Sequence, residues 1–378
     1  MIKWFLKYGA VVYLLNTVLL SIESTFSLGY AVFLLIMSVF SFLILINPKQ
    51  IKLIIFHKAF NFFLILNLIN IFYWFVFHNF SDYEAGKYLF ARGVQFSIIS
   101  FSIYYNYDYF KEKFLQHIVY AILAVIILGL IVNPFIFSGR YSGVVWNPNM
   151  LASFSCIAFA ALFLNHKKKT NFEISVLFLF LLISLATGSR GVLVGISLAF
   201  VFKYGFTILN IIYAAIAVSG YFILLSLQLD TSINRFASQG LLNDRMLQYQ
   251  YAFETVLQQP FFGWGLDKYA YINPEIVPSY LSGHIISAHN SYLAILVQYG
   301  FVFGLFILGI IFYQTIRFFL KIDKNEPAQL FYLYVIIYAV LASIYETLIT
   351  GINEFHTILF WFSFGFLSYS IHKKEYEN

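Results

Sequence analysis

The chain has 378 residues, of which 61% are hydrophobic, 21% aromatic and only 11% charged. This composition excludes an ordinary soluble domain, in which about a quarter of the residues are charged. The formal net charge of +6 comes mostly from lysines between apolar runs, which indicates membrane topology rather than a nucleic-acid partner. One cysteine, Cys156, lies in an apolar run, so we expect neither disulfides nor thiol chemistry.

Apolar runs recur along the whole chain, and most are long enough to cross a hydrocarbon core of roughly 30 Å. Lipid offers the backbone no hydrogen-bond partners and the alternation of a β-barrel is absent, so each run is expected to be a helix. The predicted spans are Trp4–Ile22, Leu28–Ile46, Ala59–Phe77, Tyr88–Tyr105, Phe114–Val132, Met150–Asn165, Phe172–Thr187, Val192–Phe202, Phe206–Leu227, Ser291–Leu320, Ala328–Ile349 and Phe355–Ile371. The predicted fold is all-α: a polytopic membrane protein with about 12 transmembrane helices in a single integral membrane domain, residues 1–378.

Basic residues in short loops stay in the cytoplasm, which gives the orientation of the chain. With both termini cytoplasmic, the inner side receives Lys3, Lys7, Lys49, Lys52, Lys58, Lys111, Lys113, Lys167, Lys168, Lys169, Lys203, Arg317, Lys321, Lys324, Lys373 and Lys374. The outer side receives Lys87, Arg92, Arg140, Arg190, Arg235, Arg245 and Lys268. For any one arginine, a contact with lipid headgroups or a loop carboxylate is the better explanation. The set, however, predicts a phosphate ligand, because the planar guanidinium fork suits phosphate oxygens.

Residues 228–290 form the one long polar interruption, predicted to be a large external loop between the ninth and tenth spans. The loop collects most of the charged and titratable side chains that chemistry would need. They are Arg235, Asp244, Arg245, Glu254, Asp267, His284 and His289. We therefore expect the functional site to lie in this loop or to face it.

The first local pattern is Ala186-Thr187-Gly188-Ser189-Arg190-Gly191 at the outer end of the seventh span. Glycines on both sides of Arg190 permit a turn and a close backbone approach, so the guanidinium is expected to point into a cavity at the membrane surface. The alternative is a tight helix–helix turn whose arginine reaches the lipid headgroups.

The second pattern is a predicted amphipathic helix on the outer surface, starting near Asn243 or Asp244 as N-cap and ending before Pro260. Its apolar positions at helical spacing are Met246, Tyr249, Ala252, Phe253 and Val256. Arg245 lies on the first turn, where a guanidinium and free backbone N–H groups meet an anion together. Alternatively, this is a packing helix whose Arg245 pairs with Asp244 or Asp267.

The third pattern is Ser287-Ala288-His289-Asn290-Ser291-Tyr292, where the polar loop re-enters the membrane. Histidine titrates near physiological pH, which makes His289 a candidate general base for a sugar hydroxyl. The alternative is a structural histidine next to a helix N-cap, satisfied by Asn290 or Ser291. No glutamate stands at metal-ligand spacing from His284, so no metal site is predicted.

These patterns, in this order and on this topology, resemble the family of O-antigen ligases and Wzy-type O-antigen or capsule polymerases. The resemblance is specific from about Gly188 to Tyr299. It is carried by Ser189-Arg190-Gly191, by the Arg245 helix with Pro260 and Gly263-Trp264-Gly265, and by Ala288-His289-Asn290-Ser291 with Tyr299-Gly300. Asn147-Pro148-Asn149 before the sixth span is also similar to a family feature.

The resemblance implies glycosyl transfer at the external face of the bacterial inner membrane, from an undecaprenyl diphosphate-linked oligosaccharide donor to an acceptor. Nucleotide sugar, cofactor and metal are not expected. At the matching positions, Arg190 and Arg245 would hold the diphosphate, and His289 would activate the acceptor hydroxyl for inverting attack on the anomeric carbon. The further expected substrate contacts are Arg140, Arg92, Asn149, Trp264 and Asn290. The lipid bilayer, and the chain-length regulator and flippase of the same pathway, are the expected partners.

Besides a polymerase, three other functions stay open at this point: a ligase, a transporter or flippase, and a purely structural protein. A polymerase extends another lipid-linked repeat unit, whereas a ligase transfers the finished glycan to a lipid A core or another acceptor. We expect a polymerase, because the external loop offers little surface for a large acceptor. The competing class is a twelve-span transporter or lipid-linked oligosaccharide flippase, which fits the basic loop His166–Lys169 at the middle of the spans but not the arginines gathered at one face. A purely structural membrane protein explains the topology but not the Arg and His patterns.

Overall fold

The structure is a computed structural model that describes residues 2–78, 81–205, 207–208, 210, 212, 245–268, 277–281 and 288–376, except for the side chains of Ile2 and Arg190. Within these residues the fold is all-helical and contains no strand, which confirms the predicted all-α class. Most of the predicted ninth span, Phe206–Leu227, and about half of the external loop, residues 228–244, 269–276 and 282–287, lie outside the described residues.

The helices follow most of the predicted spans closely. They are α1 Ile2–Leu20, α2 Phe26–Ile46, α3 Pro48–Ile55, α4 Asn61–Phe77, α5 Tyr83–Glu112, α6 Phe114–Val132, α7 Pro148–Phe163, α8 Asn171–Ala186, α9 Arg190–Tyr204, α12 Arg245–Gln258, α13 Ser291–Lys321, α14 Pro327–Ala342 and α15 Phe355–Tyr376. Two of them contain a non-helical residue, Asn106 in α5 and Gly300 in α13. The short helix α3, which begins with Pro48, was not expected.

Four helical segments of the described chain are long and apolar enough to cross a membrane: Glu23–Ile46, Lys58–Phe77, Phe114–Val132 and Ser291–Lys321. Shorter apolar helices are Pro148–Phe163, Asn171–Ala186, Gly191–Tyr204 and Pro327–Ala342. These segments make the chain a membrane protein, and the count of about 12 spans stays a prediction.

The predicted span Ala328–Ile349 is wrong at its end, because α14 stops at Ala342. Residues 343–354 form a connection to α15 that we call the α14–α15 loop. Its first carbonyls are used by other segments: Ser343 O accepts from Ser291 N at 2.9 Å, and Ile344 O accepts from Asn290 Nδ2 at 3.0 Å. Because these long-range bonds satisfy groups that a helix would otherwise pair, the helix ends although the sequence stays largely apolar.

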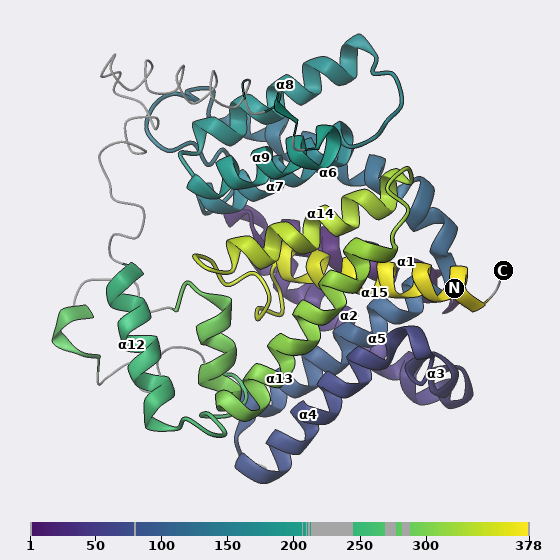
Figure 1. The fold of residues 1–378 in the computed structure, drawn as a ribbon, viewed down its shortest axis with the longest axis vertical. Helices are drawn as coiled ribbons and strands as arrows, with labels where there is room; N and C mark the ends of the chain where they lie inside the picture. Colours follow the sequence, from purple (N-terminus) through teal and green to yellow (C-terminus); the bar gives the residue numbers. More distant parts are fainter. Residues whose placement is uncertain are drawn as a thin grey trace.

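The bundle has one end rich in lysine. Asn106 Nδ2 of α5 donates to the carbonyl of Lys7 in α1 at 3.5 Å, and Lys111 of α5 pairs with Glu326 before α14 at 3.0 Å. Lys321 at the end of α13 pairs with Glu375 of α15. The two termini lie on this side of the molecule (Figure 1). The helices that leave this end bring the α14–α15 loop and the starts of α13 and α15 to the opposite end.

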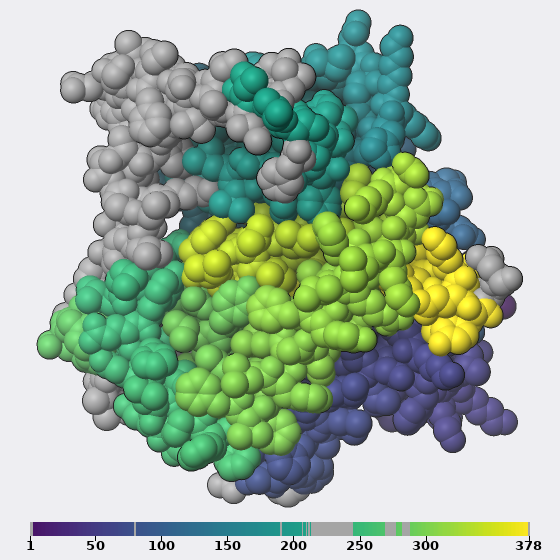
Figure 2. Space-filling model, viewed as in Figure 1, coloured from purple at the N-terminus to yellow at the C-terminus, as the bar shows by residue number. Residues whose placement is uncertain are grey.

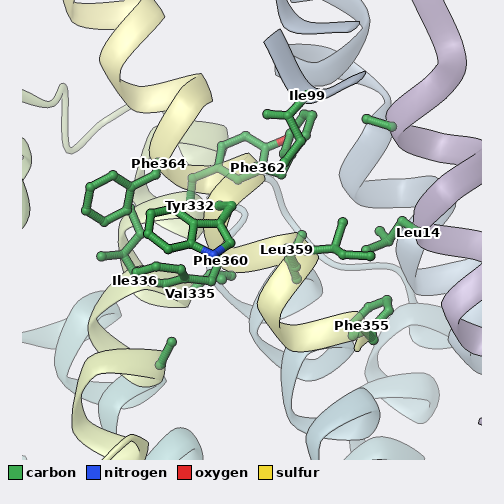
Figure 3. Packing of buried hydrophobic residues seen from close by; sticks show 14 of the residues in the cluster. Leu14, Ile99, Tyr332, Val335, Ile336, Phe355, Leu359, Phe360, Phe362 and Phe364 are labelled. Atoms are coloured by element: carbon green, nitrogen blue, oxygen red, sulfur yellow. The ribbon is translucent and has the colours of Figure 1, made fainter. Parts of the chain in front are cut away.

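Helix α15 forms the centre of the core. From Phe355 to Ile371 almost every side chain is buried, and the helix packs on α1, α5, α13 and α14. Figure 3 shows Tyr332 and Ile336 of α14 gathered with Phe360 and Phe362 of α15. Because the α14–α15 loop joins two helices of this core, both of its ends have fixed positions.

The turn after α12 docks on the kink of α13 through two glycines. Gly263 and Gly300 have φ values of 68° and 63°. A Cβ on Gly300 would lie 2.4 Å from the backbone of Phe261. Trp264 N donates to Val297 O at 2.8 Å, and Phe301 N donates to Pro260 O at 2.7 Å. The paired motifs Gly263-Trp264-Gly265 and Tyr299-Gly300 therefore join α12 to α13.

Replacing Gly300 with alanine is expected to destabilise the fold by about 1–3 kcal/mol or more, because the new side chain meets both a positive φ and the backbone of Phe261. The melting temperature in detergent measures this loss. The matched control is Gly309→Ala in the same helix, where a Cβ meets nothing within 4 Å. Equal melting temperatures for the two variants would show that the close approach is not required.

Candidate active site

The α14–α15 loop receives side chains from helices that are far apart in the sequence. Arg245 and Tyr249 reach it from α12, Asn290 and Ser291 from the start of α13, and Asn149 from α7. The segment around this loop reaches the surface between the α12–α13 segments and the α7–α9 segments (Figure 2). This is the place where the predicted motifs converge.

Glu346 is the charged centre of the convergence. Its Oε1 accepts from Arg245 Nη2 at 2.8 Å and from Asn149 Nδ2 at 3.5 Å. Its Oε2 lies 3.6 Å from His289 Nδ1. The three charged or titratable side chains are partly open to solvent, with exposures of 27% for Arg245 and 25% for both His289 and Glu346. A ligand can therefore reach this cluster, which we call the Glu346 cluster: Asn149, Arg245, His289 and Glu346.

The surroundings of Glu346 keep its carboxyl group ionised. Burial alone raises its pKa, but the adjacent His289 imidazole and the Arg245 guanidinium together bring the pKa below the ordinary carboxyl value. A group with a lowered folded-state pKa contributes stability above its unfolded pKa and loses it as pH falls through the folded value. The Glu346 carboxylate is therefore ionised at neutral pH.

Arg140 holds the amide of Asn149. Its guanidinium donates through Nη2 to Asn149 Oδ1, and Nε donates to Thr187 O at 3.1 Å. With Oδ1 engaged, the Asn149 amide turns Nδ2 toward Glu346. The preceding residues explain the Asn-Pro-Asn motif, since Asn147 caps α7 by accepting from Asn149 N at 2.9 Å and Pro148 occupies the first helical turn.

The backbone of the Arg190 motif lies next to the α14–α15 loop. Gly188, with φ of 61°, makes the turn between α8 and α9, and α9 begins at Arg190. A Cβ on Gly191 would lie 3.4 Å from the ring of Tyr345, the neighbour of Glu346. The start of α9 thus adjoins the Glu346 cluster, while the Arg190 side chain lies outside the described part of the structure.

His289 has an unusual backbone conformation. Its φ of 40° is one of only two positive values among the non-glycine residues that the structure describes. The next residue, Asn290, caps α13 by accepting from Tyr292 N at 2.9 Å and Leu293 N at 3.0 Å. Ser291 Oγ donates to Glu346 O at 3.1 Å. Together with the bond from Asn290 to Ile344, these contacts hold His289 in a conformation that costs free energy, as is common at functional sites.

Replacing Asn290 with alanine is expected to lower stability by about 1–2 kcal/mol, because it removes a helix cap and the bond to Ile344 O. Thermal unfolding in detergent measures this change. The exposed Asn171→Ala in α8 serves as the control. A melting temperature equal to that of the control variant would contradict the stabilising role assigned to the Asn290 side chain.

Arg92 and Trp264, both expected to bind substrate, are engaged by the protein itself. Arg92 is 3% exposed, and its guanidinium donates to Thr350 O at 2.6 Å and Gly351 O at 3.1 Å. It lines a cavity of about 40 Å³ below the α14–α15 loop. The indole of Trp264 donates to Thr255 O at 2.9 Å. Arg92 thus supports the loop from inside, and Trp264 closes the end of α12.

Two expectations about the α12 helix need correction. Arg245 pairs with Glu346 and not with Asp267, whose pKa is raised to about 6 by burial and by the nearby Glu84 carboxylate. The second suggested partner, Asp244, and the residues Arg235 and His284 lie outside the described residues.

The apolar positions expected on one face of α12 are not all covered, because Met246 and Phe253 are 53% and 48% exposed while Ala252 and Val256 are buried. Contacts with the rest of the protein, rather than polarity, decide which face of α12 is covered.

Sequence reasoning missed Glu346. The residue lies inside the predicted span Ala328–Ile349 and was not among the candidate site residues. A signal was present, because an ionisable residue in a membrane segment is rare and usually functional. Its partners were not readable, since Arg245 and Glu346 are separated by 101 positions in the chain.

Residues 175–309 match the family model described as O-antigen ligase (Wzy_C). No curated protein matches the chain. The matched segment includes Arg190, Arg245 and His289, whereas Asn149 and Glu346, which complete the cluster, stand on either side of it. Enzymes of this family are glycosyltransferase-like. Over residues 175–309 the chain is therefore similar to the O-antigen ligase (Wzy_C) family, and this similarity supports a function of the O-antigen ligase or polymerase type.

Proposed function

We propose that this protein is a polysaccharide polymerase, an inverting glycosyltransferase that joins undecaprenyl diphosphate-linked oligosaccharide repeat units at the external face of the cytoplasmic membrane. The observation that carries the proposal is the meeting of Arg245, His289 and the start of α9 at the α14–α15 loop. A cationic group for a diphosphate and a base for a hydroxyl are the two elements that this reaction needs.

In the proposed reaction, His289 takes the proton of an acceptor hydroxyl as its oxygen forms a bond to the anomeric carbon of the donor. The bond between that carbon and the diphosphate oxygen breaks, and undecaprenyl diphosphate leaves. Attack from the face opposite the leaving group inverts the anomeric configuration. Each glycosidic bond formed therefore releases one undecaprenyl diphosphate.

Arg190 and Arg245 are proposed to bind the diphosphate and to stabilise the negative charge that grows on it. Guanidinium groups donate in pairs to phosphate oxygens, and such bonds are strongest where water is scarce. Two guanidiniums supply the charge that a divalent metal otherwise provides, so the proposal requires neither metal nor nucleotide sugar. Arg245 has a second donor engaged with Tyr345 O, which directs its guanidinium toward the α14–α15 loop.

Arg140 and Asn149 are the best placed of the remaining proposed substrate contacts, because Asn149 contacts Glu346 and Arg140 donates to Asn149. Arg92, Trp264 and Asn290 bind the scaffold in this structure. To contact the substrate, these side chains have to release their present partners in the protein and bind the substrate instead.

The external placement of the site is also a proposal. It is supported by the separation of charge along the bundle, with Lys7, Lys111 and Lys321 at one end and Arg140 and Arg245 at the other. Lysine-rich ends stay in the cytoplasm. This orientation makes both termini cytoplasmic and residues 228–290 external, where the pathway's flippase would deliver the donor and a chain-length regulator would meet the product.

Reconstitution in liposomes with undecaprenyl diphosphate-linked oligosaccharide, followed by product sizing on gels and by mass spectrometry, tests the proposal. A ladder of lengthening lipid-linked chains is expected with protein and not with protein-free liposomes. If the glycan is transferred only to an added lipid A core, the protein is a ligase and not a polymerase. If the donor crosses the bilayer without covalent change, the protein is a transporter and not a glycosyltransferase.

A further inference from the structure

We infer that Glu346 is a positioning residue for His289, holding the imidazole with its Nδ1 proton toward the carboxylate so that Nε2 faces the acceptor hydroxyl. This inference rests on the proposed function, because it gives one ring nitrogen of the proposed base its role. It concerns a residue outside the segment that matches the O-antigen ligase model.

The backbones that carry the two residues are tied together. Ser291, two positions after His289, donates through Oγ to Glu346 O at 3.1 Å and accepts from Leu348 N at 2.9 Å. Asn290 donates to Ile344 O. The distance between His289 and Glu346 is therefore set by neighbouring backbone bonds and not by long flexible side chains.

The other partners of Glu346 fix the orientation of its carboxylate. Arg245 and Asn149 both donate to Oε1, and Arg140 fixes the amide of Asn149. Oε2 is left on the side of His289, 3.6 Å from Nδ1. This is longer than a good hydrogen bond, as is common for catalytic pairs before the substrate closes the site. A carboxylate facing Nδ1 selects the ring form that protonates there and leaves the Nε2 lone pair for the substrate.

Several charged groups face this pair from the surrounding elements. Arg245 approaches from α12, Arg140 acts through Asn149 from the side of α7, and Tyr345 adjoins Glu346 in the loop. Glu354, at the end of the α14–α15 loop, and His356, in the first turn of α15, interact with Glu346 electrostatically. The Glu346 charge stabilises the imidazolium that forms when His289 takes a proton, while Arg245 opposes it. Removing the negative charge of Glu346 therefore weakens the base and at the same time releases Arg245 for the diphosphate.

Glu346→Gln, which keeps the shape and removes the charge, provides the test in the liposome assay. We expect kcat to fall by at least about tenfold, with no increase in the KM for the lipid-linked donor. The acidic limb of the pH–rate profile should move to lower pH, because a base without its carboxylate protonates less readily. Glu346→Asp should recover part of kcat and the wild-type position of the limb.

Glu254→Gln is the matched control, since this carboxylate of α12 binds Gln250 and Tyr280 instead of the cluster. A merely structural role for Glu346 predicts a lower melting temperature and less active enzyme with an unmoved pH profile, and this result would overturn the inference. Wild-type kcat in Glu346→Gln would overturn it as well.

A second readout does not depend on turnover. Histidine labelled with ¹⁵N reports which ring nitrogen carries the proton, and His289→Gln identifies the signal of His289. The neutral ring of the wild-type protein should carry its proton on Nδ1, and a proton on Nε2 would overturn the inference. Absence of glycan transfer by the wild type would instead refute the proposed function, so the two failures are distinguishable.

Discussion

Replacing His289 with alanine is expected to lower the rate of glycan transfer by roughly 10²- to 10⁴-fold, the usual contribution of a general base. The acceptor hydroxyl then has to lose its proton to water while its oxygen attacks the anomeric carbon. Turnover of donor in liposomes measures the effect at saturating donor concentration. Donor binding should be retained, because the guanidinium groups remain.

The fold of His289→Ala should also be retained. His289 is only partly buried, and Glu346 keeps Arg245 and Asn149 as partners when the imidazole is removed. The melting temperature in detergent checks this point. His117→Ala is the control, a histidine that binds Tyr109 on α5. Turnover close to wild type in His289→Ala would remove this residue from the role of base.

Replacing Arg245 with lysine is expected to reduce kcat/KM for the donor by about 10- to 10²-fold, although the charge is kept. A hydrogen bond to a charged group contributes about 1.5–3 kcal/mol, and lysine cannot reproduce the paired donors of the guanidinium. Lysine also loses the simultaneous contact with Glu346 and the Tyr345 carbonyl. Arg190→Lys should show a loss of the same kind, because it is proposed to hold the same diphosphate.

Arg317→Lys is the matched control for both variants, because Arg317 pairs with Glu375 at the lysine-rich end of the bundle. Rates measured over a range of donor concentrations separate weaker binding from slower chemistry. If both site variants keep full activity, the two arginines are topology anchors and the diphosphate binds elsewhere.

Local helix structure was predictable because apolar runs and caps are local signals. The predicted span Phe114–Val132 coincides with α6, and α12, Arg245–Gln258, lies within the surface helix predicted from Asn243 or Asp244 to before Pro260. The end of α14 was not predictable, because apolar residues continue beyond Ala342 and the helix stops where Ser291 and Asn290 donate to the carbonyls of Ser343 and Ile344, the first two residues after it. Long-range hydrogen bonds of this kind leave no periodic pattern in the sequence.

The site was predictable by its residue types and not by its pairings. Three patterns identified Arg190, Arg245 and His289, and the backbone or side chain of each reaches the α14–α15 loop. The acid that joins the last two was absent from the prediction, because the loop carrying Glu346 had been assigned to a membrane span. Asn290 illustrates a second limit, since its motif position suggested a substrate contact whereas its amide caps α13 and holds Ile344.

The most direct test of the account is the stoichiometry of the reaction in liposomes that contain only the purified protein and undecaprenyl diphosphate-linked oligosaccharide, with a metal chelator and without nucleotide sugar. The account predicts one free undecaprenyl diphosphate released for each new glycosidic bond, at a rate that falls sharply in His289→Ala. Unchanged donor with every acceptor supplied, or equal release by wild type and His289→Ala, would contradict it.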